Sequence, residues 1–350
     1  MAAAISLRCS TPEPPPEVWD REPDYYRPHD ILGHVHKPNA VRETRVPEHP
    51  DGRVFFRTEG RGFRADADIA VPKPPDTWRL LVLGDSHVDG VVDNAESLTT
   101  GLSTRLMVWA RAAGSAGRVE VVNGGTGHWG PTQYGAAPGV WAELEPDACL
   151  VLLYDGNDFL DVLAAEERAG RRPLTRGVDH FDKLLAAQEV VGEHVSQQLN
   201  QDLVMAADPA ASDDALRLTL AALKQAAGRC PLSVAVLPTA GSVQPPSAEQ
   251  QAHIGGVLGL SPSQRLSGRG LSQRLLVALE DEGVAAMDTW PALYAARHGL
   301  PALDGLKRPS QKMFWTSDQH LSVHGHAAVA RAVAESFGPV WWPDERADAQ

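Results

Sequence analysis

Short apolar runs alternate with segments of helical periodicity over most of the chain, starting at Trp78. Five of these runs predict strands, and the first of them is nearly continuous, which is typical of a strand covered on both faces. They occupy residues 78–85, 118–125, 147–158, 232–238 and 284–290. The other segments repeat apolar residues three and four positions apart, which predicts helices. These helices cover residues 97–114, 132–144, 213–229, 271–283 and 322–337.

This order of strands and helices indicates βαβ units. The predicted fold class is α/β, with a parallel sheet between two layers of helices. Two segments, residues 161–207 and 239–270, are long for ordinary connections, so we interpret them as insertions that form lids or bind substrate. We expect Ser212 and Asp213 to cap the helix that follows the first insertion.

Residues 1–77 have a different pattern, with many Pro, Arg, Asp and His residues and few apolar runs. Residues 51–66 combine β-forming apolar residues with glycine turns, which predicts a short hairpin or extended arm. This N-terminal extension has too little apolar material for its own core, so we expect it to pack on the main domain, residues 78–340. Residues 341–350 are predicted to be a disordered tail.

Composition and charge narrow the possible function classes. The chain has 350 residues, 43% of them hydrophobic, and a formal net charge of −13 without a basic run. Nucleic-acid binding depends on clustered Lys and Arg, so no nucleic-acid partner is expected. No apolar stretch reaches the roughly 18 residues of a membrane span, and the N-terminus lacks the continuous apolar segment of a signal peptide. We therefore predict a cytoplasmic protein.

The cysteines support the same compartment. Cys149 lies within an apolar run and Cys230 directly precedes another, so both are interpreted as small buried residues. With Cys9 the chain has three cysteines, which cannot all pair with one another. We favour reduced thiols over a disulfide.

Polar sequences follow three of the predicted strands. They are Gly-Asp-Ser-His at 84–87, Asn-Gly-Gly-Thr-Gly-His-Trp-Gly at 123–130 and Tyr-Asp-Gly-Asn-Asp at 154–158. A fourth polar cluster, at 317–326, precedes the last helix. Ligands of parallel α/β sheets bind at the carboxyl ends of the strands, so we expect these sequences to converge on one crevice.

Such a crevice has the groups needed for acyl transfer. Ser86 follows a strand and opens a helix, and a serine hydroxyl becomes nucleophilic when a base removes its proton. His320 is the candidate base, and Asp318 can orient its imidazole if the loop between them is extended. An oxyanion would need N–H donors: the Ser86 backbone, the turn after Asn123 and the Asn157 side chain are of the right type.

Each of these residues also has a structural interpretation. Ser86 can be a plain helix N-cap, and Asn157 with Asp158 can simply begin a helix. His320, His324 and His326 have a spacing that could bind a metal, but a packed role for His326 is favoured, and neither a metal nor another cofactor is predicted. Trp129, Trp290 and Trp315 could stack on a sugar or pack in the core.

The four motifs together, in this order, resemble the blocks of the SGNH hydrolase (GDSL) superfamily. The resemblance covers about Trp78 to Gly338, and the N-terminal arm looks like that of some bacterial members. It implies a three-layer α/β/α fold with a flavodoxin-like parallel sheet, and ester or acyl-transfer chemistry without a metal. A Gly-x-Ser-x-Gly elbow surrounds none of the serines, so the ordinary α/β-hydrolase fold is the weaker candidate.

The resemblance assigns a role to each matched residue. Ser86 would be the nucleophile and one oxyanion donor, Asn157 another donor, His320 the base and Asp318 its orienting acid. The family's glycine donor falls on Gly127 if the turn is one residue shorter than the common Asn-x-Gly-x-x-Gly pattern, and on His128 otherwise. His87 replaces the leucine of the family motif. His87, His128 and Asp158 are the further candidates for substrate contact.

The leading hypothesis is a serine esterase or deacylase that hydrolyses the O-acyl ester of a small molecule or carbohydrate. The first alternative is an acyltransferase, in which an alcohol or amine replaces water at the same acyl-enzyme. A third hypothesis is a non-catalytic binding module that has kept the crevice. The intact set of serine, aspartate, histidine and asparagine argues against the third.

Overall fold

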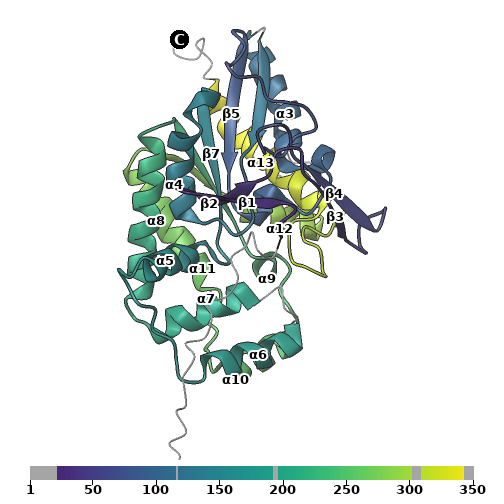
Figure 1. Ribbon diagram of the computed structural model, residues 1–350. Helices are drawn as coiled ribbons and strands as arrows, with labels where there is room; N and C mark the ends of the chain where they lie inside the picture. The colour runs from purple at the N-terminus through teal and green to yellow at the C-terminus, as the bar shows by residue number, and fades with distance from the viewer. Residues whose placement is uncertain (1–21, 116, 192–195, 302–308, 343–350) are drawn as a thin grey trace, which may run out of the picture.

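The computed structural model describes residues 22–115, 117–191, 196–301 and 309–342. Cys9 and the predicted tail beyond residue 342 lie outside the described residues. The core of the described chain is one five-stranded sheet in the order β6-β5-β7-β8-β9 (Figure 1). Its strands are β5 (Thr77–Leu83), β6 (Arg118–Asn123), β7 (Ala148–Tyr154), β8 (Leu232–Leu237) and β9 (Ala285–Asp288).

All four neighbouring pairs in this sheet are parallel. Numbered within the sheet, the strand order is 2-1-3-4-5, the flavodoxin-like arrangement. The predicted α/β class and strand order are therefore confirmed. The chain reverses its direction of winding between β5 and β7, which opens a crevice at the carboxyl ends of these strands.

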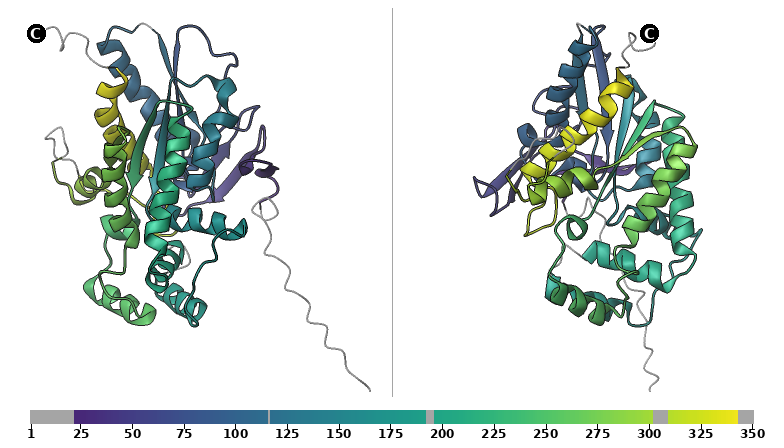
Figure 2. Two further views of the ribbon diagram at one scale, coloured as in Figure 1. Left: turned by 90° about the vertical axis from the view of Figure 1, so that its left-hand side faces the viewer. Right: turned by 180° about the vertical axis from the view of Figure 1, so that it is seen from behind.

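Helices cover both faces of the sheet (Figure 2). One layer holds α4 (Pro131–Val140), α5 (Asp158–Arg168), α8 (Ala211–Ala227) and α11 (Ser267–Asp281). The other holds α3 (Leu98–Ala112), α12 (Trp290–His298) and α13 (Val323–Trp341). Successive residues of β5 alternate between the layers, since Leu81 and Leu83 pack in the first core and Leu80 and Val82 in the second. The continuous apolar run follows from this two-sided burial.

The predicted cap of α8 is wrong. The helix begins at Ala211, so Ser212 and Asp213 lie within its first turn, where Asp213 instead pairs with Arg274 at 2.6 Å. Among the described helices, none combines the length and apolarity that crossing a bilayer requires.

The prediction of reduced thiols is also wrong. Cys149 and Cys230 are buried as expected, but they form a disulfide with Cα atoms 5.8 Å apart. Cys149 lies on β7, and Cys230 lies two residues before β8, the strand that pairs with β7. Sheet pairing thus brings together two residues that are 81 positions apart in the sequence. Because disulfides persist in oxidising compartments, the cytoplasmic prediction loses the support it drew from the cysteines.

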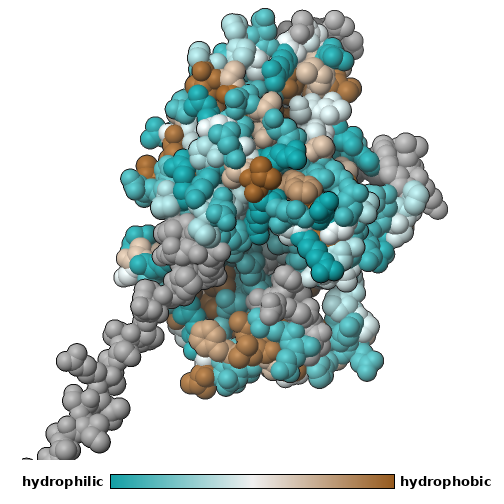
Figure 3. Space-filling model, turned by 45° about the vertical axis from the view of Figure 1, so that its right-hand side comes forward, coloured by the Kyte–Doolittle hydropathy of each residue, from teal (hydrophilic) through white to brown (hydrophobic). Residues whose placement is uncertain are grey.

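The two predicted insertions pack together into a lobe (Figure 1). It contains α6 (His180–Val191), α7 (Ser196–Ala207) and α10 (Ala248–Leu258), and the short α9 (Ala240–Val243) lies nearby. The lobe has its own small core of Ala187, Leu199, Leu203, Ile254, Leu258 and Leu260. Figure 3 shows the surface hollowed between this lobe and the main body.

The N-terminal arm, described from residue 22, consists of two antiparallel hairpins. They pair β1 (Tyr26–His29) with β2 (Gly33–His36), and β3 (Val41–Arg45) with β4 (Arg53–Arg57). The hairpin expected within residues 51–66 pairs mainly with upstream residues instead, and only a single bridge joins Thr58 to Arg64. Phe56 and Tyr25 of the arm pack with Val92 of the main domain.

One buried carboxylate links the arm to the main domain. Asp89 ends the short helix α2 (Ser86–Asp89) and accepts hydrogen bonds from the hydroxyls of Tyr25 at 3.2 Å and Tyr26 at 3.3 Å. His36 Nε2 lies 3.2 Å from the same carboxylate, and Arg64 lies 3.9 Å away. Burial raises the pKa of Asp89, but His36 and Arg64 outweigh it and lower that pKa to about 2.

Replacing Asp89 with asparagine is expected to lower the free energy of unfolding by about 2–4 kcal/mol at pH 7, because three buried donors lose a charged acceptor. The folded pKa lies below its ordinary 3.8, so the carboxylate stabilises the fold above pH 4. This contribution disappears as the pH falls from about 4 to about 2. Urea unfolding at pH 7, 5 and 3 should therefore show a difference that shrinks only at pH 3. Glu43→Gln removes an exposed arm pair and serves as the control, with an effect below about 1 kcal/mol. Equal unfolding energies of wild type and the Asp89 variant at pH 7 would contradict the prediction.

Candidate active site

Ser86 is the first residue of α2 and follows the carboxyl end of β5, Leu83, by three positions. The N-cap of this helix is Asp85, whose side chain accepts a hydrogen bond from the backbone N–H of His87 at 2.8 Å. The interpretation of Ser86 as the helix cap is therefore wrong. Because Asp85 takes that role, the Ser86 hydroxyl is left for another partner.

That partner is His320. Its Nε2 atom lies 2.8 Å from Ser86 Oγ, although the two residues are 234 positions apart. The Asp318 carboxylate holds His320 at two points, since Oδ1 accepts from the His320 backbone N–H at 3.0 Å and Oδ2 lies 3.4 Å from Nδ1. The loop between them is not extended as predicted: Gln319 has a φ of 63°, and this left-handed turn lets one carboxylate face both the backbone and the ring.

The electrostatics of the site favour a protonated imidazole. Burial lowers the pKa of His320, but the hydrogen bond and charge of Asp318, together with Asp85 and Asp89, outweigh it and raise that pKa above 6.5. Burial also raises the pKa of Asp85 to about 6, against the opposing effects of the His87 N–H and the His320 charge. An imidazolium formed during a reaction would therefore be stabilised.

A cleft of about 440 Å³ joins the predicted residues. Ser86, Asp318, His320, Gly127 and Asn157 all line it. The backbone N–H groups of Ser86 and Gly127 have no hydrogen-bond partner within the part of the chain that the structure describes. They can therefore donate to a ligand beside the serine hydroxyl.

The Asn157 amide is oriented by a residue that sequence reasoning missed. Asn157 is 5% exposed, and its Nδ2 donates to the Asp161 carboxylate one helical turn further along α5. Its Oδ1 has no partner among the described residues. The carboxylate thus defines which end of the amide is the nitrogen, and the second Nδ2 hydrogen remains for a ligand. The i, i+4 spacing of the two residues, at a position where the sequence allowed a helix to begin, was the available signal.

The turn after Asn123 presents both candidate positions to the cleft. A side chain at Gly127 would meet the Tyr26 hydroxyl 2.5 Å from its Cβ, so this close approach requires glycine. His128 has a φ of 64°, and its exposed side chain lines the cleft. His128 thus lies at the cleft, and its contact with a substrate stays a prediction.

His87 and Asp158 are not part of the cleft wall, contrary to the prediction. His87 is 3% exposed, and its ring packs 4.0 Å from that of Tyr154 and 4.9 Å from that of His320. Asp158 is fully buried and accepts hydrogen bonds from the Tyr134 hydroxyl at 3.0 Å and the Tyr154 backbone at 2.8 Å. Both side chains are therefore buried next to residues of the site and do not line the cleft.

The other residues that line the cleft come from segments outside the four polar sequences described above. The arm contributes Glu22, Tyr26, Arg42, Thr44 and Phe56, and the insertion lobe contributes Gln197. Arg42 donates to Glu22 at 2.6 Å, so the wall is polar and its charges are paired. The separation of these residues from the motifs explains why the sequence did not reveal them.

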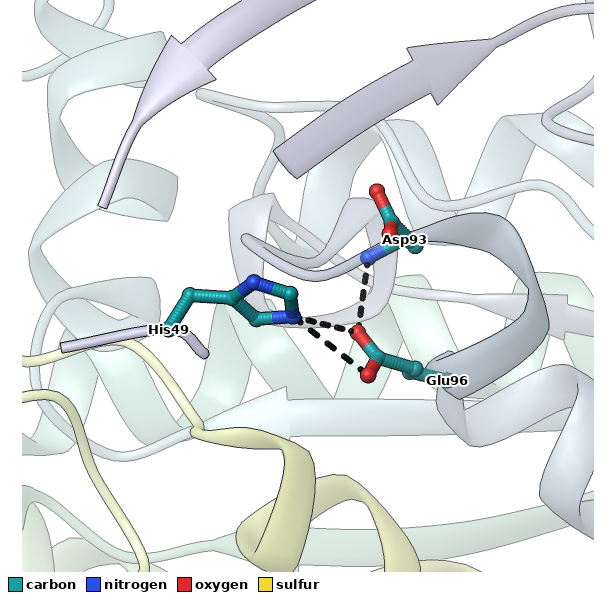
Figure 4. A group of neighbouring side chains, drawn as sticks. All are labelled: His49, Asp93 and Glu96. Atoms are coloured by element: carbon teal, nitrogen blue, oxygen red, sulfur yellow. Dashed lines mark hydrogen bonds and ion pairs between the residues drawn. The ribbon is translucent and has the colours of Figure 1, made fainter. Parts of the chain in front are cut away.

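A group of three residues that could hold a metal ion lies between the arm and the main domain, and none of the three lines the cleft (Figure 4). The ligand atoms of His49, Asp93 and Glu96 lie within 4.8 Å of one another. His49 Nδ1 accepts from the Asp51 backbone, so Nε2 carries the hydrogen that faces Glu96 at 3.1 Å. Asp93 accepts from the Phe55 backbone at 2.6 Å. These atoms already serve hydrogen bonds that join the arm to the main domain.

Of the other histidines singled out in the sequence, His324 is exposed on α13, whereas His326 and the three tryptophans have packing roles. His326 is buried and its Nδ1 accepts from the Leu98 backbone at 3.1 Å, as favoured over a metal role. Trp129 and Trp315 are buried, and Trp290 donates to the Ser242 carbonyl at 3.0 Å. None of the three tryptophans lines the cleft.

Neither a protein-family model nor a curated protein matches the sequence. Solved structures that align with it include a lipolytic G-D-S-L family protein from Veillonella parvula, with 11% identity, 74% of this chain and 98% of that chain covered, and a TM-score of 0.39. A carbohydrate acetylesterase from Sinorhizobium meliloti aligns with 12% identity, coverage of 75% and 99%, and a TM-score of 0.38. An acetylxylan esterase mutant from Geobacillus stearothermophilus aligns with 15% identity, coverage of 75% and 95%, and a TM-score of 0.37.

These TM-scores are all below 0.5, so the similarity is too weak to assign a class to this protein. The class is therefore taken from the strand order and from the site itself. The described chain is a three-layer α/β/α protein with a flavodoxin-like sheet. At the carboxyl edge of that sheet, Ser86 lies within hydrogen-bonding distance of His320, and the Asp318 carboxylate accepts from the His320 backbone and lies 3.4 Å from its ring.

Proposed function

We propose that the chain is a serine esterase or deacylase of the SGNH hydrolase (GDSL) superfamily. Its substrate would be the O-acyl ester of a small molecule or carbohydrate, since the cleft is small and its far wall is polar. The observation that supports this most directly is the 2.8 Å separation of Ser86 Oγ and His320 Nε2 in a cleft with unpaired N–H donors. The order of the sequence motifs and the strand order of the sheet agree with it.

In the proposed reaction, Ser86 Oγ attacks the ester carbonyl while His320 Nε2 takes its proton. The carbonyl oxygen becomes an oxyanion that accepts from the Ser86 N–H, the Gly127 turn and Asn157 Nδ2. Collapse breaks the ester bond, and the imidazolium returns the proton to the leaving alcohol. Water then attacks the acyl-serine by the same route, which releases the acid and restores the hydroxyl.

The acid limb of kcat/KM is expected to have its midpoint above pH 6.5. Protonated His320 cannot accept the serine proton, and Asp318 raises the pKa of His320 in the free protein. Activity should therefore fall as the pH decreases through this raised pKa and level off above it. Initial rates with p-nitrophenyl acetate between pH 5 and pH 9 measure the midpoint. A midpoint below 6.5 would contradict the electrostatic account of His320.

A fluorophosphonate probe together with p-nitrophenyl acetate tests the proposed function on the wild-type protein. We expect turnover of the ester, stoichiometric labelling by the probe and loss of activity in proportion to labelling. Peptide mass spectrometry should locate the adduct on Ser86. A protein that neither labels nor hydrolyses esters would support the binding-module hypothesis and overturn the proposal, and so would an adduct on another serine.

The acyl-transfer alternative uses the same residues and the same acyl-enzyme. It is favoured by one observation, that the insertion lobe brings Gln197 to the cleft and so gives an alcohol or amine acceptor a wall to bind. Turnover of p-nitrophenyl acetate with added sugar alcohols and amines separates the two. Acylated acceptor in excess of free acetate would favour transfer, whereas acetate alone favours hydrolysis.

A further inference from the structure

The N-terminal arm contacts three of the four segments that carry the proposed reactive groups, the exception being the one with Asn157. Asp89 of the nucleophile helix binds Tyr25 and Tyr26 of the arm. We propose that the arm is a positioning element of the active site, in which His34 holds the oxyanion turn and Glu48 holds the Asp318–His320 loop. This inference rests on the proposed function.

His34 binds the turn at two points. Its Nε2 lies 2.8 Å from the Gly127 carbonyl oxygen, and its own carbonyl accepts from Trp129 Nε1 at 3.0 Å. Burial lowers the pKa of His34 to about 4, so at neutral pH the imidazole is uncharged and donates one N–H to Gly127. Strand β2 therefore holds the peptide that follows Gly127, and with it the orientation of the turn.

Tyr26 supports the turn from the cleft side. Its hydroxyl occupies the space beside Gly127 where a Cβ would lie, and it is itself held by Asp89. The ring is buried against His34 and His36, with centroids 5.1 Å and 5.2 Å away. Two side chains of the same hairpin, packed against each other, thus both contact Gly127 and restrict the movement of the turn.

Glu48, in the connection between β3 and β4, holds the second loop. Its Oε1 accepts from the Ser317 backbone N–H at 2.8 Å, one residue before Asp318, and Lys312 pairs with the same carboxylate at 3.2 Å. Burial raises the pKa of Glu48, but the backbone N–H groups of Thr316 and Ser317 outweigh it and lower that pKa to about 2. A charged acceptor therefore fixes the start of the loop at all working pH values.

These contacts matter because oxyanion stabilisation depends on donors held within a fraction of an ångström. His34→Phe removes the hydrogen bond to Gly127 but keeps a ring in the space. We expect it to lower kcat for p-nitrophenyl acetate about 10- to 100-fold, with KM changed less than about threefold. His34→Gln keeps an N–H donor and should recover most of the lost rate. His29→Phe alters the same hairpin without contacting Gly127, and should keep kcat within about twofold.

Glu48→Ala is expected to lower kcat about 5- to 50-fold, again with little change in KM, because the loop before Asp318 loses its backbone acceptor. Glu48→Gln keeps an acceptor oxygen for Ser317 and should recover most of the rate. Glu43→Ala, at an exposed glutamate of the same arm, provides the matched control. Each variant is first compared with wild type by circular dichroism and thermal unfolding, so that only folded proteins enter the comparison.

Hydrogen–deuterium exchange on the same proteins measures the positioning without reference to catalysis. Peptides covering residues 124–130 should exchange faster in His34→Phe, and those covering 315–321 faster in Glu48→Ala, than in wild type. Unchanged kcat in both variants of an active wild type would overturn the inference and leave the proposed function intact. An inactive wild type would instead overturn the proposed function. If hydrogen–deuterium exchange were then also unchanged in His34→Phe and Glu48→Ala, the positioning role would be overturned as well.

Discussion

Replacing Ser86 with alanine is expected to lower kcat for ester hydrolysis by at least about 10³-fold and to abolish labelling by a fluorophosphonate. Without the hydroxyl no acyl-enzyme can form, and a water molecule in its place lacks the orientation that the 2.8 Å contact with His320 provides. The residual rate would come from the oxyanion donors alone. Initial-rate kinetics and gel-based labelling at matched protein concentration measure both effects.

The fold should tolerate this substitution, because Asp85 rather than Ser86 caps helix α2. We expect the free energy of unfolding to change by less than about 1 kcal/mol. Ser263→Ala, at an exposed serine of the insertion lobe, is the matched control and should retain wild-type kinetics and labelling. His320→Ala should lose a similar factor, and the double variant little more, because the two residues act as a unit. Labelling of the Ser86 variant at the wild-type rate would show that the nucleophile lies elsewhere.

Replacing Asp318 with asparagine has the second largest expected effect, a loss of about 10²- to 10⁴-fold in kcat. The carboxylate holds the His320 backbone and faces Nδ1 at 3.4 Å, so it favours the tautomer with a hydrogen on Nδ1 and a lone pair on Nε2. An amide can donate to Nδ1 and so favour the opposite tautomer, which presents a hydrogen to Ser86. The imidazolium formed during acyl transfer also loses its nearest charge.

The pH profile distinguishes this electrostatic role from a merely structural one. Asp318 is the main influence that raises the pKa of His320, so the acid limb of kcat/KM should move to lower pH in the variant. Asp281→Asn, at an exposed carboxylate on α11, should leave both the rate and the acid limb unchanged. If Asp318→Asn keeps more than half of the wild-type rate, another carboxylate orients His320, and the buried Asp85 would be the next to test.

Most of the fold could be predicted from the sequence because the signals involved are local. The continuous apolar runs predict strands buried on both faces, and their alternation with helical periodicity leaves few topologies other than a parallel sheet between helices. Some local predictions failed, such as the cap of α8, but the prediction of reduced thiols failed because it depended on a contact between distant residues. Cys149 and Cys230 are 81 positions apart, and only the pairing of β7 with β8 brings their Cα atoms to 5.8 Å.

For the candidate site, too, the residue types could be predicted from the sequence but the contacts between distant residues could not. The residue types Ser86, Asn157, Asp318 and His320 at the ends of predicted elements could be singled out, because a parallel sheet gathers its carboxyl ends at one edge. Their distances could not be predicted, since a hydrogen bond over 234 positions depends on how α2 and the loop before α13 pack. The left-handed turn at Gln319 was missed for a related reason, because tertiary contacts rather than local preference select it.

The sequence by itself determined the α/β class, the order of the elements and the residues whose side chains could take part in catalysis. These features depend on periodicity and on polar residues at strand ends, and both are properties of residues close together in the sequence. Only the tertiary structure decided that Asp85 caps the nucleophile helix, that Asp161 orients Asn157, and that His87 and Asp158 are buried supports. It also decided that the arm forms a wall of the cleft. No sequence pattern in the arm indicates that it contributes to the site. Its side chains line the cleft only because the arm packs against the main domain.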